Sequence, residues 1–298
     1  MPKSPRLSKK FSKPLLSRLI NGDISPTTTP DKPQTTRLDL YLVEKYPNYN
    51  RNTLKKFIKD GSVTVNGEVI TKPNFQIFGT ESIHLSEPSI TPLEKPNLPI
   101  IYEDDNVLVL DKPAGMLSMS KGDYNPEPTI EDYGLLVHRL DRGTSGVIIL
   151  AKNESAKTHL QKQFQSRRAH KTYYAIVVGH PEPSHAIINI PLARNLARPT
   201  TFQPREDGRE AITEYEVVDQ TDQYSLLRLS PTTGRTHQLR VHLKHIGTPI
   251  LGDTVYDAPP ANRLYLHATS LEITIPDSLR KTFTSPIPEE FTNVFKQS

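Results

Sequence analysis

The spacing of apolar residues predicts two short helices in the segment 37–88. Leu38, Leu42 and Val43 recur at the spacing of one helical face. A second apolar face follows over residues 51–59, where basic side chains occupy the other positions. A β-hairpin is predicted after it, because two short alternating runs flank an Asn-Gly turn. The remaining signals are Pro47 and Gly61 as helix ends, strands over 63–65 and 68–70, and the turn at 66–67.

Beyond residue 100 the pattern changes to short apolar runs that are typical of strands. Two helical patterns interrupt them, at residues 154–166, where Asn153 is the candidate cap, and at residues 236–245. Because the strands do not alternate regularly with helices, a doubly wound parallel sheet is disfavoured. We therefore expect an α+β domain built on a mixed, largely antiparallel sheet. The predicted strands cover residues 100–102, 107–110, 147–151, 173–178, 215–218, 225–229 and 264–266.

Two segments lack such a pattern and divide the chain. Residues 1–36 are rich in Pro, Ser, Thr and Lys, which predicts a disordered tail with at most one short helix, over residues 15–20. Residues 89–99 contain three prolines, which predicts a semi-extended linker. The expected organisation is a tail over 1–36, a small unit over 37–88, a linker over 89–99 and a large domain over 100–298.

Composition narrows the chemistry available to the chain. It contains no cysteine, which excludes disulfides, thiolate nucleophiles and cysteine-ligated metal centres. No apolar run approaches the ~20 residues of a membrane span, and Arg18 interrupts the apolar stretch near the N-terminus. We therefore expect a cytoplasmic protein without a membrane partner.

The positive charge is unevenly distributed. The net charge is +4, and residues 1–36 hold seven lysines and arginines against two aspartates. Such a tail is compatible with binding to nucleic acid, whose phosphates attract basic segments, and also with a solubilising role. The second predicted helix leaves the same two interpretations open, because its basic side chains could face water or phosphates. These side chains are Arg51, Lys55, Lys56 and Lys59.

Three short motifs occur in order within the small unit. They are Arg-Leu-Asp at 37–39, the basic helix, and Gly-Ser-Val-Thr-Val-Asn-Gly at 61–67. Together they resemble the S4-like RNA-binding domain, although Asn-Arg at 50–51 replaces the usual Ser-Arg and Gly-Thr-Glu at 79–81 replaces the usual Gly-Asp. These departures affect a helix cap and a turn. The resemblance implies a small α/β domain that binds RNA, contacted by Arg37, Arg51, Lys55, Lys56 and Lys59.

A polar loop at residues 138–146 carries the motif His-Arg-Leu-Asp-Arg-Gly-Thr-Ser-Gly. It places Asp141 between Arg139 and Arg142, and its two glycines permit sharp turns. Arginines nearby favour the charged form of a carboxylate, which suits a nucleophile or an ionised base better than a general acid. The residues alone leave open the alternative that surface salt bridges hold this aspartate in a turn.

A second polar motif, Thr-Gly-Arg-Thr-His-Gln-Leu-Arg-Val-His, covers residues 233–242. Helical spacing places Thr236, Arg240 and Lys244 on one face, with apolar residues roughly opposite. Arg240 could thus point inward, where a buried cation requires a carboxylate partner. The two histidines of the motif lie five residues apart and have no third ligand nearby, so no metal site is expected.

Four further motifs complete an ordered set. They are Asp-Lys-Pro-Ala-Gly at 111–115, Lys-Thr-Tyr-Tyr-Ala at 171–175 with Gly179, Gly-Asp at 252–253 with Tyr256, and Leu-His-Ala at 266–268 with Leu271. With the two motifs above, they resemble the RluA-type pseudouridine synthases over residues 37–280. The resemblance implies the pseudouridine synthase fold and the isomerisation of uridine in RNA without cofactor or metal. In this reaction the base is detached at nitrogen, turned, and rejoined to the sugar through carbon 5.

The same resemblance implies a role for each of five residues. Asp141 matches the catalytic carboxylate, which acts either as a nucleophile at the sugar or through a glycal. Tyr173 matches a tyrosine that stacks on uracil and lies near the proton at carbon 5, and Arg240 matches the arginine paired with the aspartate. Leu271 matches an apolar residue beside the uracil. Arg139 resembles a residue that fills the gap left by a flipped uridine.

One segment departs from the family pattern. Between Gly115 and His138 the family usually has a longer segment with a histidine near its start, whereas this chain has Met-Leu-Ser-Met-Ser-Lys-Gly at 116–122 and then a proline-rich stretch. The target uridine therefore cannot be transferred from a relative. The S4-like unit and the family's common targets favour large-subunit rRNA as the substrate, and tRNA is the alternative.

Two other classes of function remain as alternatives. A non-catalytic RNA-binding protein on the same scaffold is disfavoured because Asp141, Tyr173 and Arg240 are all present. A hydrolase of nucleosides or glycosides usually needs a second carboxylate, and none stands out in the matched motifs. We expect a monomeric RNA pseudouridine synthase.

Overall fold

The computed structural model describes residues 35–86, 94–120 and 127–296. The helix expected over residues 15–20 and nearly all of the expected disordered tail lie outside the described residues, as does the first half of the expected linker. Residues 94–99, which end that linker, have no regular secondary structure.

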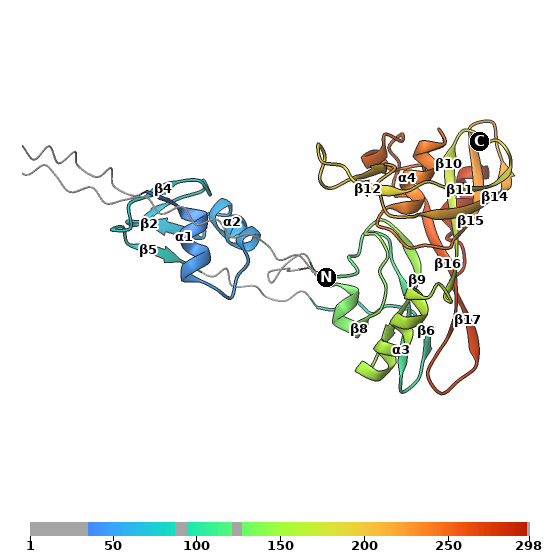
Figure 1. The fold of residues 1–298 in the computed structure, drawn as a ribbon, viewed down its shortest axis with the longest axis horizontal. Helices are drawn as coiled ribbons and strands as arrows, with labels where there is room; N and C mark the ends of the chain where they lie inside the picture. Colours follow the sequence, from blue (N-terminus) through green and yellow to red (C-terminus); the bar gives the residue numbers. More distant parts are fainter. Residues whose placement is uncertain (1–34, 87–93, 121–126, 297–298) are drawn as a thin grey trace, which may run out of the picture.

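The N-terminal unit contains the predicted helices and hairpin. Figure 1 shows its two helices beside its short strands, and their apolar side chains form a core that contains Leu38, Leu54 and Phe57. Asn50 caps the second helix, because its side chain accepts hydrogen bonds from the backbone N–H groups of Asn52 and Thr53. The elements are β1 (Thr36–Arg37), α1 (Leu38–Lys45), α2 (Arg51–Lys59), β2 (Val63–Val65), β3 (Glu68–Val69), β4 (Gln76–Ile77) and β5 (Ile83–Leu85).

A ten-stranded sheet organises the rest of the chain, in the order β11-β14-β15-β10-β16-β9-β7-β6, with β17 beside β16 and β8 beside β9. All of its neighbouring strands are antiparallel except β16 and β9, which confirms the predicted mixed, largely antiparallel sheet. The strands are β6 (Ile100–Glu103), β7 (Val107–Lys112), β8 (Leu135–Leu136), β9 (Ser145–Ala151), β10 (His170–Val178), β11 (His185–Asn189), β14 (Ile212–Gln220), β15 (Tyr224–Pro231), β16 (Leu266–Thr274) and β17 (Arg280–Thr284).

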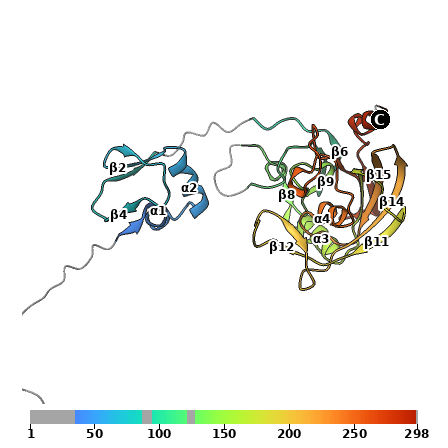
Figure 2. The ribbon, with the colours of Figure 1, turned by 90° about the horizontal axis from the view of Figure 1, so that it is seen from above.

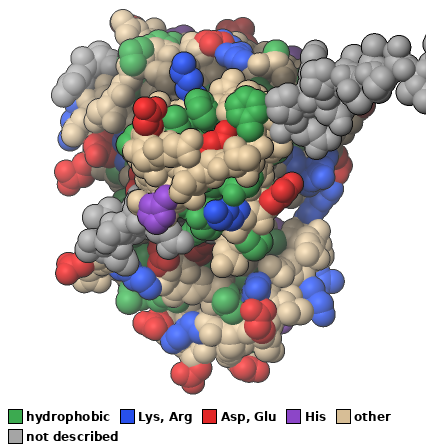
Figure 3. Space-filling view, turned by 90° about the vertical axis from the view of Figure 1, so that its left-hand side faces the viewer, with side chains coloured by type: hydrophobic (Ala, Val, Ile, Leu, Met, Phe, Trp, Pro, Cys, Tyr) green, Lys and Arg blue, Asp and Glu red, His purple; other side chains and the backbone are tan. Residues whose placement is uncertain are grey.

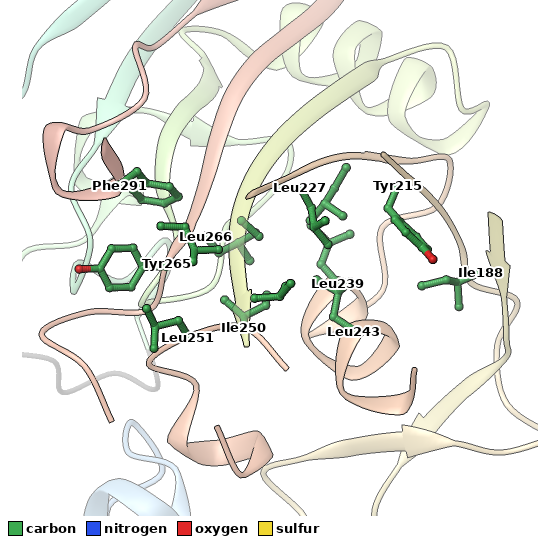
Figure 4. Close-up of a cluster of buried hydrophobic side chains, with 14 residues drawn as sticks. Ile188, Tyr215, Leu227, Leu239, Leu243, Ile250, Leu251, Tyr265, Leu266 and Phe291 are labelled. Carbon is green, nitrogen blue, oxygen red and sulfur yellow. The ribbon is translucent and has the colours of Figure 1, made fainter. Parts of the chain in front are cut away.

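The helices bury their apolar faces against this sheet. Leu239 and Leu243 of α4 lie in one core cluster with Leu227 of β15, as Figure 4 shows, and Figure 2 shows the curved strands β11, β14 and β15 around this helix. Leu160 of α3 packs in a second cluster with residues of β7 and β9. The remaining elements are α3 (Glu154–Gln165), α4 (Gln238–His245), α5 (Glu289–Lys296), the 3₁₀ turns Ile130–Tyr133 and Thr254–Tyr256, and a hairpin of β12 (Leu192–Arg194) and β13 (Phe202–Pro204).

Gly146 makes the single parallel contact of the sheet possible. Strands β9 and β16 pair through Ser145 with His267 and Gly146 with Ala268. A Cβ at position 146 would lie 2.1 Å from the carbonyl oxygen of Ala268, and the φ angle of +109° also disfavours a side chain. The polar loop at residues 138–146, called the signature loop below, can therefore enter the sheet beside β16 only with glycine at position 146.

Candidate active site

A buried lysine fixes the backbone of the signature loop. Lys112 is fully buried at the end of β7, and its ammonium donates to the carbonyl oxygens of Pro113, Arg142 and Thr144 at 3.0, 3.2 and 2.7 Å. Burial lowers the pKa of Lys112 to about 7, and the charge of Asp141 opposes that shift. The Lys-Pro motif thus holds the loop that presents Asp141.

Two further contacts set the direction of the loop. The buried hydroxyl of Ser118 donates to the carbonyl oxygen of Leu140 and accepts from its N–H, at 2.7 and 3.0 Å. The ring of His138 stacks on Phe164, and its Nε2 accepts from the backbone N–H of Ile149 at 3.0 Å. Burial lowers the pKa of His138 to about 3, so this ring is neutral and carries its proton on Nδ1. The histidine of the signature is therefore a structural residue.

Arg240 links the signature loop to a second carboxylate. As predicted, it is buried and lies within reach of Asp141, with 3.3 Å between Nη1 and Oδ2. Its shorter bonds, however, go to Asp253, where Nε and Nη2 each donate at 2.7 Å. Hydrogen bonds and charge from Asp253, followed by the charge of Asp141, raise the pKa of Arg240 although burial alone would lower it. The sequence argument named one partner for this arginine, and the structure gives it two.

Aromatic side chains complete the surroundings of this pair. The Arg240 guanidinium lies 5.0 Å from the ring centroid of Tyr256, which is a cation–π distance. The Tyr256 hydroxyl lies 2.8 Å from Nδ1 of His237, and Nε2 of that ring lies 3.9 Å from the Asp141 carboxylate. His237 has a φ angle of 57°, a left-handed conformation that is uncommon for a residue with a side chain. Burial lowers the pKa of His237, which therefore faces the carboxylate as a neutral ring at pH 7.

Asp141 lies where two cavities meet. One cavity, of about 440 Å³, is also lined by Tyr173 and Lys171, and the other, of about 630 Å³, by Met119, Val255 and several polar residues. Asp141 and Arg240 line both cavities. Burial, reinforced by the negative charge of Asp141, raises the pKa of Tyr173 well above its usual value, so its hydroxyl stays protonated. The arrangement places a carboxylate and a neutral phenol in the wall of one cavity.

The other expected site residues differ in position. Arg139 is exposed at the rim shared by the two cavities, and its guanidinium donates to the hydroxyl of Thr236. Leu271 is 1% exposed and packs in the cluster that contains Leu160 of α3. Among the described residues, the wall of the cavity beside Tyr173 contains Leu266 and not Leu271. Leu271 was predicted as a site residue from a sequence motif alone. In the structure its side chain is part of the hydrophobic core.

The basic residues of the N-terminal unit gather around one buried carboxylate. Asp39 is fully buried, and it accepts hydrogen bonds from Arg37 at 2.9 Å and from Arg51 at 2.8 Å, with the Lys55 ammonium 3.8 Å away. Burial alone would raise the pKa of Asp39, but these arginines lower it. The aspartate of the Arg-Leu-Asp motif therefore holds two half-exposed guanidinium groups at the surface. Lys56 and Lys59 lie exposed on the same helix.

Three residues of the site were not predicted from the sequence. Asp253 and Tyr256 belong to a matched motif, but only their contacts with Arg240 assign them a place. His237 was considered as a metal ligand and instead lies between Tyr256 and Asp141. In the described part of the chain, no group of three or more His, Asp or Glu side chains is arranged to hold a metal ion. No helix within the described ranges is long and apolar enough to cross a membrane.

Comparisons with known proteins agree with this geometry. Residues 106–245 match the family model of RNA pseudouridylate synthases, and residues 36–78 match that of the S4 domain. An uncharacterized RNA pseudouridine synthase of Aquifex aeolicus is 38% identical over 74% of this chain and 76% of the relative. Ribosomal large subunit pseudouridine synthase D of Escherichia coli is 31% identical over 87% of this chain and 90% of the relative.

Solved structures give the same result. Human RNA pseudouridylate synthase domain containing 1 superposes with a TM-score of 0.57 and 26% identity, covering 68% of this chain and 96% of that one. Human RNA pseudouridylate synthase domain containing 4 superposes with a TM-score of 0.56 and 27% identity, and the match covers 66% of this chain and 92% of that one. Given these likenesses along most of its length, and the Asp141–Arg240 pair at the meeting of two cavities, the chain belongs to the RNA pseudouridine synthase family, with an S4 domain before its catalytic domain.

Proposed function

We propose that this enzyme converts uridine to pseudouridine in large-subunit rRNA, with Asp141 as its catalytic carboxylate. The observation that carries the residue assignment is the position of Asp141, which lines both cavities while Arg240 donates to it at 3.3 Å. The assignment of the substrate rests on the Escherichia coli relative. Its name specifies the large ribosomal subunit, and it aligns with 87% of this chain. The enzyme would then work in the cytoplasm, where ribosomes are assembled.

The geometry divides the reaction among three side chains. The Asp141 carboxylate either attacks C1′ of the target ribose or removes the proton at C2′, and the bond between C1′ and N1 of uracil breaks. Arg240 fixes the carboxylate from one side, since Asp253 holds its guanidinium by two bonds of 2.7 Å. Tyr173 offers its ring for stacking, and because its pKa is raised it enters the reaction as a phenol rather than as a phenolate base. After the uracil turns, C5 bonds to C1′ while the bond between Asp141 and C1′ breaks or, in the glycal route, while the proton returns to C2′, and C5 then releases its own proton.

We further propose a division of labour along the chain. Residues 37–88 bind RNA through Arg37, Arg51, Lys55, Lys56 and Lys59, and residues 100–298 carry the reaction, with residues 89–99 as a linker. Separate core clusters support this division, because one contains only residues between Leu38 and Leu85 and the others begin at Leu98. On the face shown in Figure 3, basic and acidic side chains are interspersed, so local clusters must supply the attraction for phosphates. Asp141, Tyr173 and Arg240 line cavities formed within one chain, and we propose that a single copy of the chain is sufficient for the reaction.

The test combines chemistry in vitro with mapping in cells. Asp141→Asn should abolish tritium release from rRNA labelled at C5 of uridine while RNA affinity stays within a few-fold, and Asp105→Asn, at an exposed turn, is the matched control. Pseudouridines in cellular RNA are mapped with and without the gene. Loss of a site in large-subunit rRNA supports the proposed substrate, and loss confined to tRNA overturns it. Turnover by Asp141→Asn near the wild-type rate would remove Asp141 from the mechanism.

A further inference from the structure

Two lysines near the site differ in how their N–H donors are used. An ammonium group has three N–H donors, and Lys112 uses all three on backbone carbonyl oxygens. Lys171, at the start of β10, has one acceptor among the described residues, the carbonyl oxygen of Thr233 at 3.4 Å. Among the described residues, no carboxylate lies within 4.0 Å of either ammonium. Lys171 is therefore a partly buried cation with donors to spare.

Lys171 lines the same cavity as Asp141. Lys171 and Tyr173 lie two residues apart on β10, and both line the 440 Å³ cavity. Gly234 lies next to the ammonium, and because this residue has no side chain it adds no group there; a Cβ at this position would lie 3.7 Å from Nζ. Burial lowers the pKa of Lys171 to about 8, so the group is still mainly charged at pH 7. A positive charge without a counter-ion thus lies in the wall beside the ring that is expected to stack on uracil.

The cavity has other cations in a position to meet phosphates. Arg139 and Arg167 line the same cavity and are exposed, and Arg235 lies beside them in the β15–α4 connection. Arg167 is already paired with Glu210, and Arg235 donates to the carbonyl oxygen of that residue. These side chains form the outer rim, where the sugar–phosphate backbone of a flipped nucleotide must pass. Lys171 lies deeper, at the level of Tyr173, where the base itself would sit.

We propose that Lys171 donates a hydrogen bond to a carbonyl oxygen of the target uracil and stabilises the negative charge that the ring gains as it leaves the sugar. This inference rests on the proposed function. When the C1′–N1 bond breaks, its electron pair stays with the uracil and spreads over N1 and the carbonyl oxygens. Lys171 keeps its proton throughout, the pair later forms the C5–C1′ bond, and C5 loses its proton, so nothing is oxidised or reduced. A fixed cation aimed at developing charge in a site that excludes water is an effective form of catalysis.

The decisive experiment varies the leaving ability of the base. Lys171→Met and Lys171→Arg are compared with wild type in single-turnover reactions, on RNA with either uridine or 5-fluorouridine at the target position. The rate followed is that of cleavage of the C1′–N1 bond, because the fluorinated base has no proton at C5 to release. Fluorine withdraws electrons and stabilises the departing ring, so the lysine matters less. Lys171→Met should slow the uridine reaction about 100-fold, the size seen when one oxyanion donor is removed, and should slow the fluorinated reaction about tenfold less than that. Lys171→Arg should retain most of the rate, and Lys162→Met on the exposed face of α3 is the control.

The other outcomes overturn the inference. An equal slowdown on both substrates would show a structural role, and an unchanged rate with weaker RNA affinity and a smaller salt dependence would show a phosphate contact. If Lys171→Met does not fold, the pH profile decides. The wild-type rate should fall at alkaline pH as Lys171 loses its proton, and Lys171→Arg should lack that fall, whereas identical profiles contradict the assignment. A wild-type enzyme inactive on all labelled RNA would instead refute the proposed function.

Discussion

Arg240 connects two carboxylates that have different tasks. Its Nε and Nη2 bind the two oxygens of Asp253, and its remaining Nη1 is left to point at Asp141. Because Asp253 is 2% exposed and both its oxygens are engaged, it is an anchor for the guanidinium rather than a second acid at the substrate. The geometry of Asp141 therefore depends on a residue that need not touch RNA.

This dependence predicts the effect of removing the anchor. Asp253→Asn should lower the free energy of unfolding by about 3–5 kcal/mol, because it leaves a buried guanidinium without its main partner. Arg240→Met should have an effect of similar size, and the double variant should lose far less than the sum. Urea unfolding of the four proteins measures this coupling. Additive losses would show that the two side chains act independently.

The neutral ring of His138 predicts an acid sensitivity. Its pKa is about 3 in the folded protein and about 6.5 when unfolded, so between these values the unfolded chain binds more protons. The stability that this ring contributes is complete above about pH 6.5 and falls as the pH drops towards 3, by up to about 5 kcal/mol. His138→Gln places an amide oxygen where Nε2 accepts from Ile149 and should flatten this part of the pH dependence.

The matched control for this prediction is His84→Gln, which changes an exposed histidine of β5. Chemical denaturation at several pH values between 4 and 7 provides the comparison. A wild-type slope that persists in His138→Gln would mean that other groups cause the acid sensitivity.

At the scale of elements, local patterns were sufficient wherever an element is amphipathic by itself. The helices α2 and α3, the Asn153 cap and the hairpin β2–β3 were all predicted close to their observed bounds. The predicted helix over 236–245 begins instead at Gln238, because His237 before it has a left-handed backbone. Such a conformation depends on contacts with Tyr256 and Asp141 that local spacing cannot show.

Elements whose environment is set by distant strands were missed. The prediction of 264–266 caught only the start of β16, which runs to Thr274, since polar residues such as His267 are buried in it and hide its alternation. Strand β17 shows one buried side chain, Phe283, and was not predicted, nor were β11, β12, β13 and α5. Within the site, sequence motifs were sufficient to predict Asp141, Tyr173 and Arg240. The hydrogen bonds from Arg240 to Asp253, and the N–H donors of Lys171 that have no acceptor among the described residues, could be seen only in the folded structure.

The parallel pairing of β9 with β16 gives a prediction at the scale of elements. Gly146→Ala should destabilise the protein by about 3 kcal/mol or more, because the new Cβ would collide with the backbone of Ala268 and also adopt an unfavourable φ. Gly247→Ala separates the two effects, since its φ is +86° but nothing lies within 4 Å of the added carbon. It should cost about 1–2 kcal/mol. Thermal unfolding measures both, and equal losses would argue against the close approach.

At the scale of the whole molecule, affinity and chemistry should be separable. Deleting residues 1–88 removes the basic tail and the S4 domain but none of the residues in the core clusters of the sheet. RNA binding should weaken and its dependence on salt should flatten, because fewer phosphates are neutralised. The remaining chain should still release tritium from labelled RNA at high enzyme concentration. Filter binding at several salt concentrations and tritium release are the two measurements.

A smaller change tests the same idea without removing a domain. Lys56→Gln with Lys59→Gln keeps the Asp39 cluster intact, and should lower the slope of log affinity against log salt by up to about 2 if both lysines contact phosphates. An unchanged slope in both the deletion and this variant would show that the N-terminal unit does not meet the RNA backbone.

The place of β16 in the sheet has a consequence for how the enzyme is made. This strand lies between β10 and β9 although it follows both of them in the chain, so the two parts of the sheet that hold Tyr173 and Asp141 are joined only after residue 266 has been synthesised. A ribosome must therefore synthesise the chain through β16 before the two halves of the site can meet, and such distant pairings form slowly. We therefore expect the nascent chain to be inactive until β16 is made, and a polypeptide truncated before this strand to keep Asp141, Tyr173 and Arg240 without the strand that joins the two halves of the site.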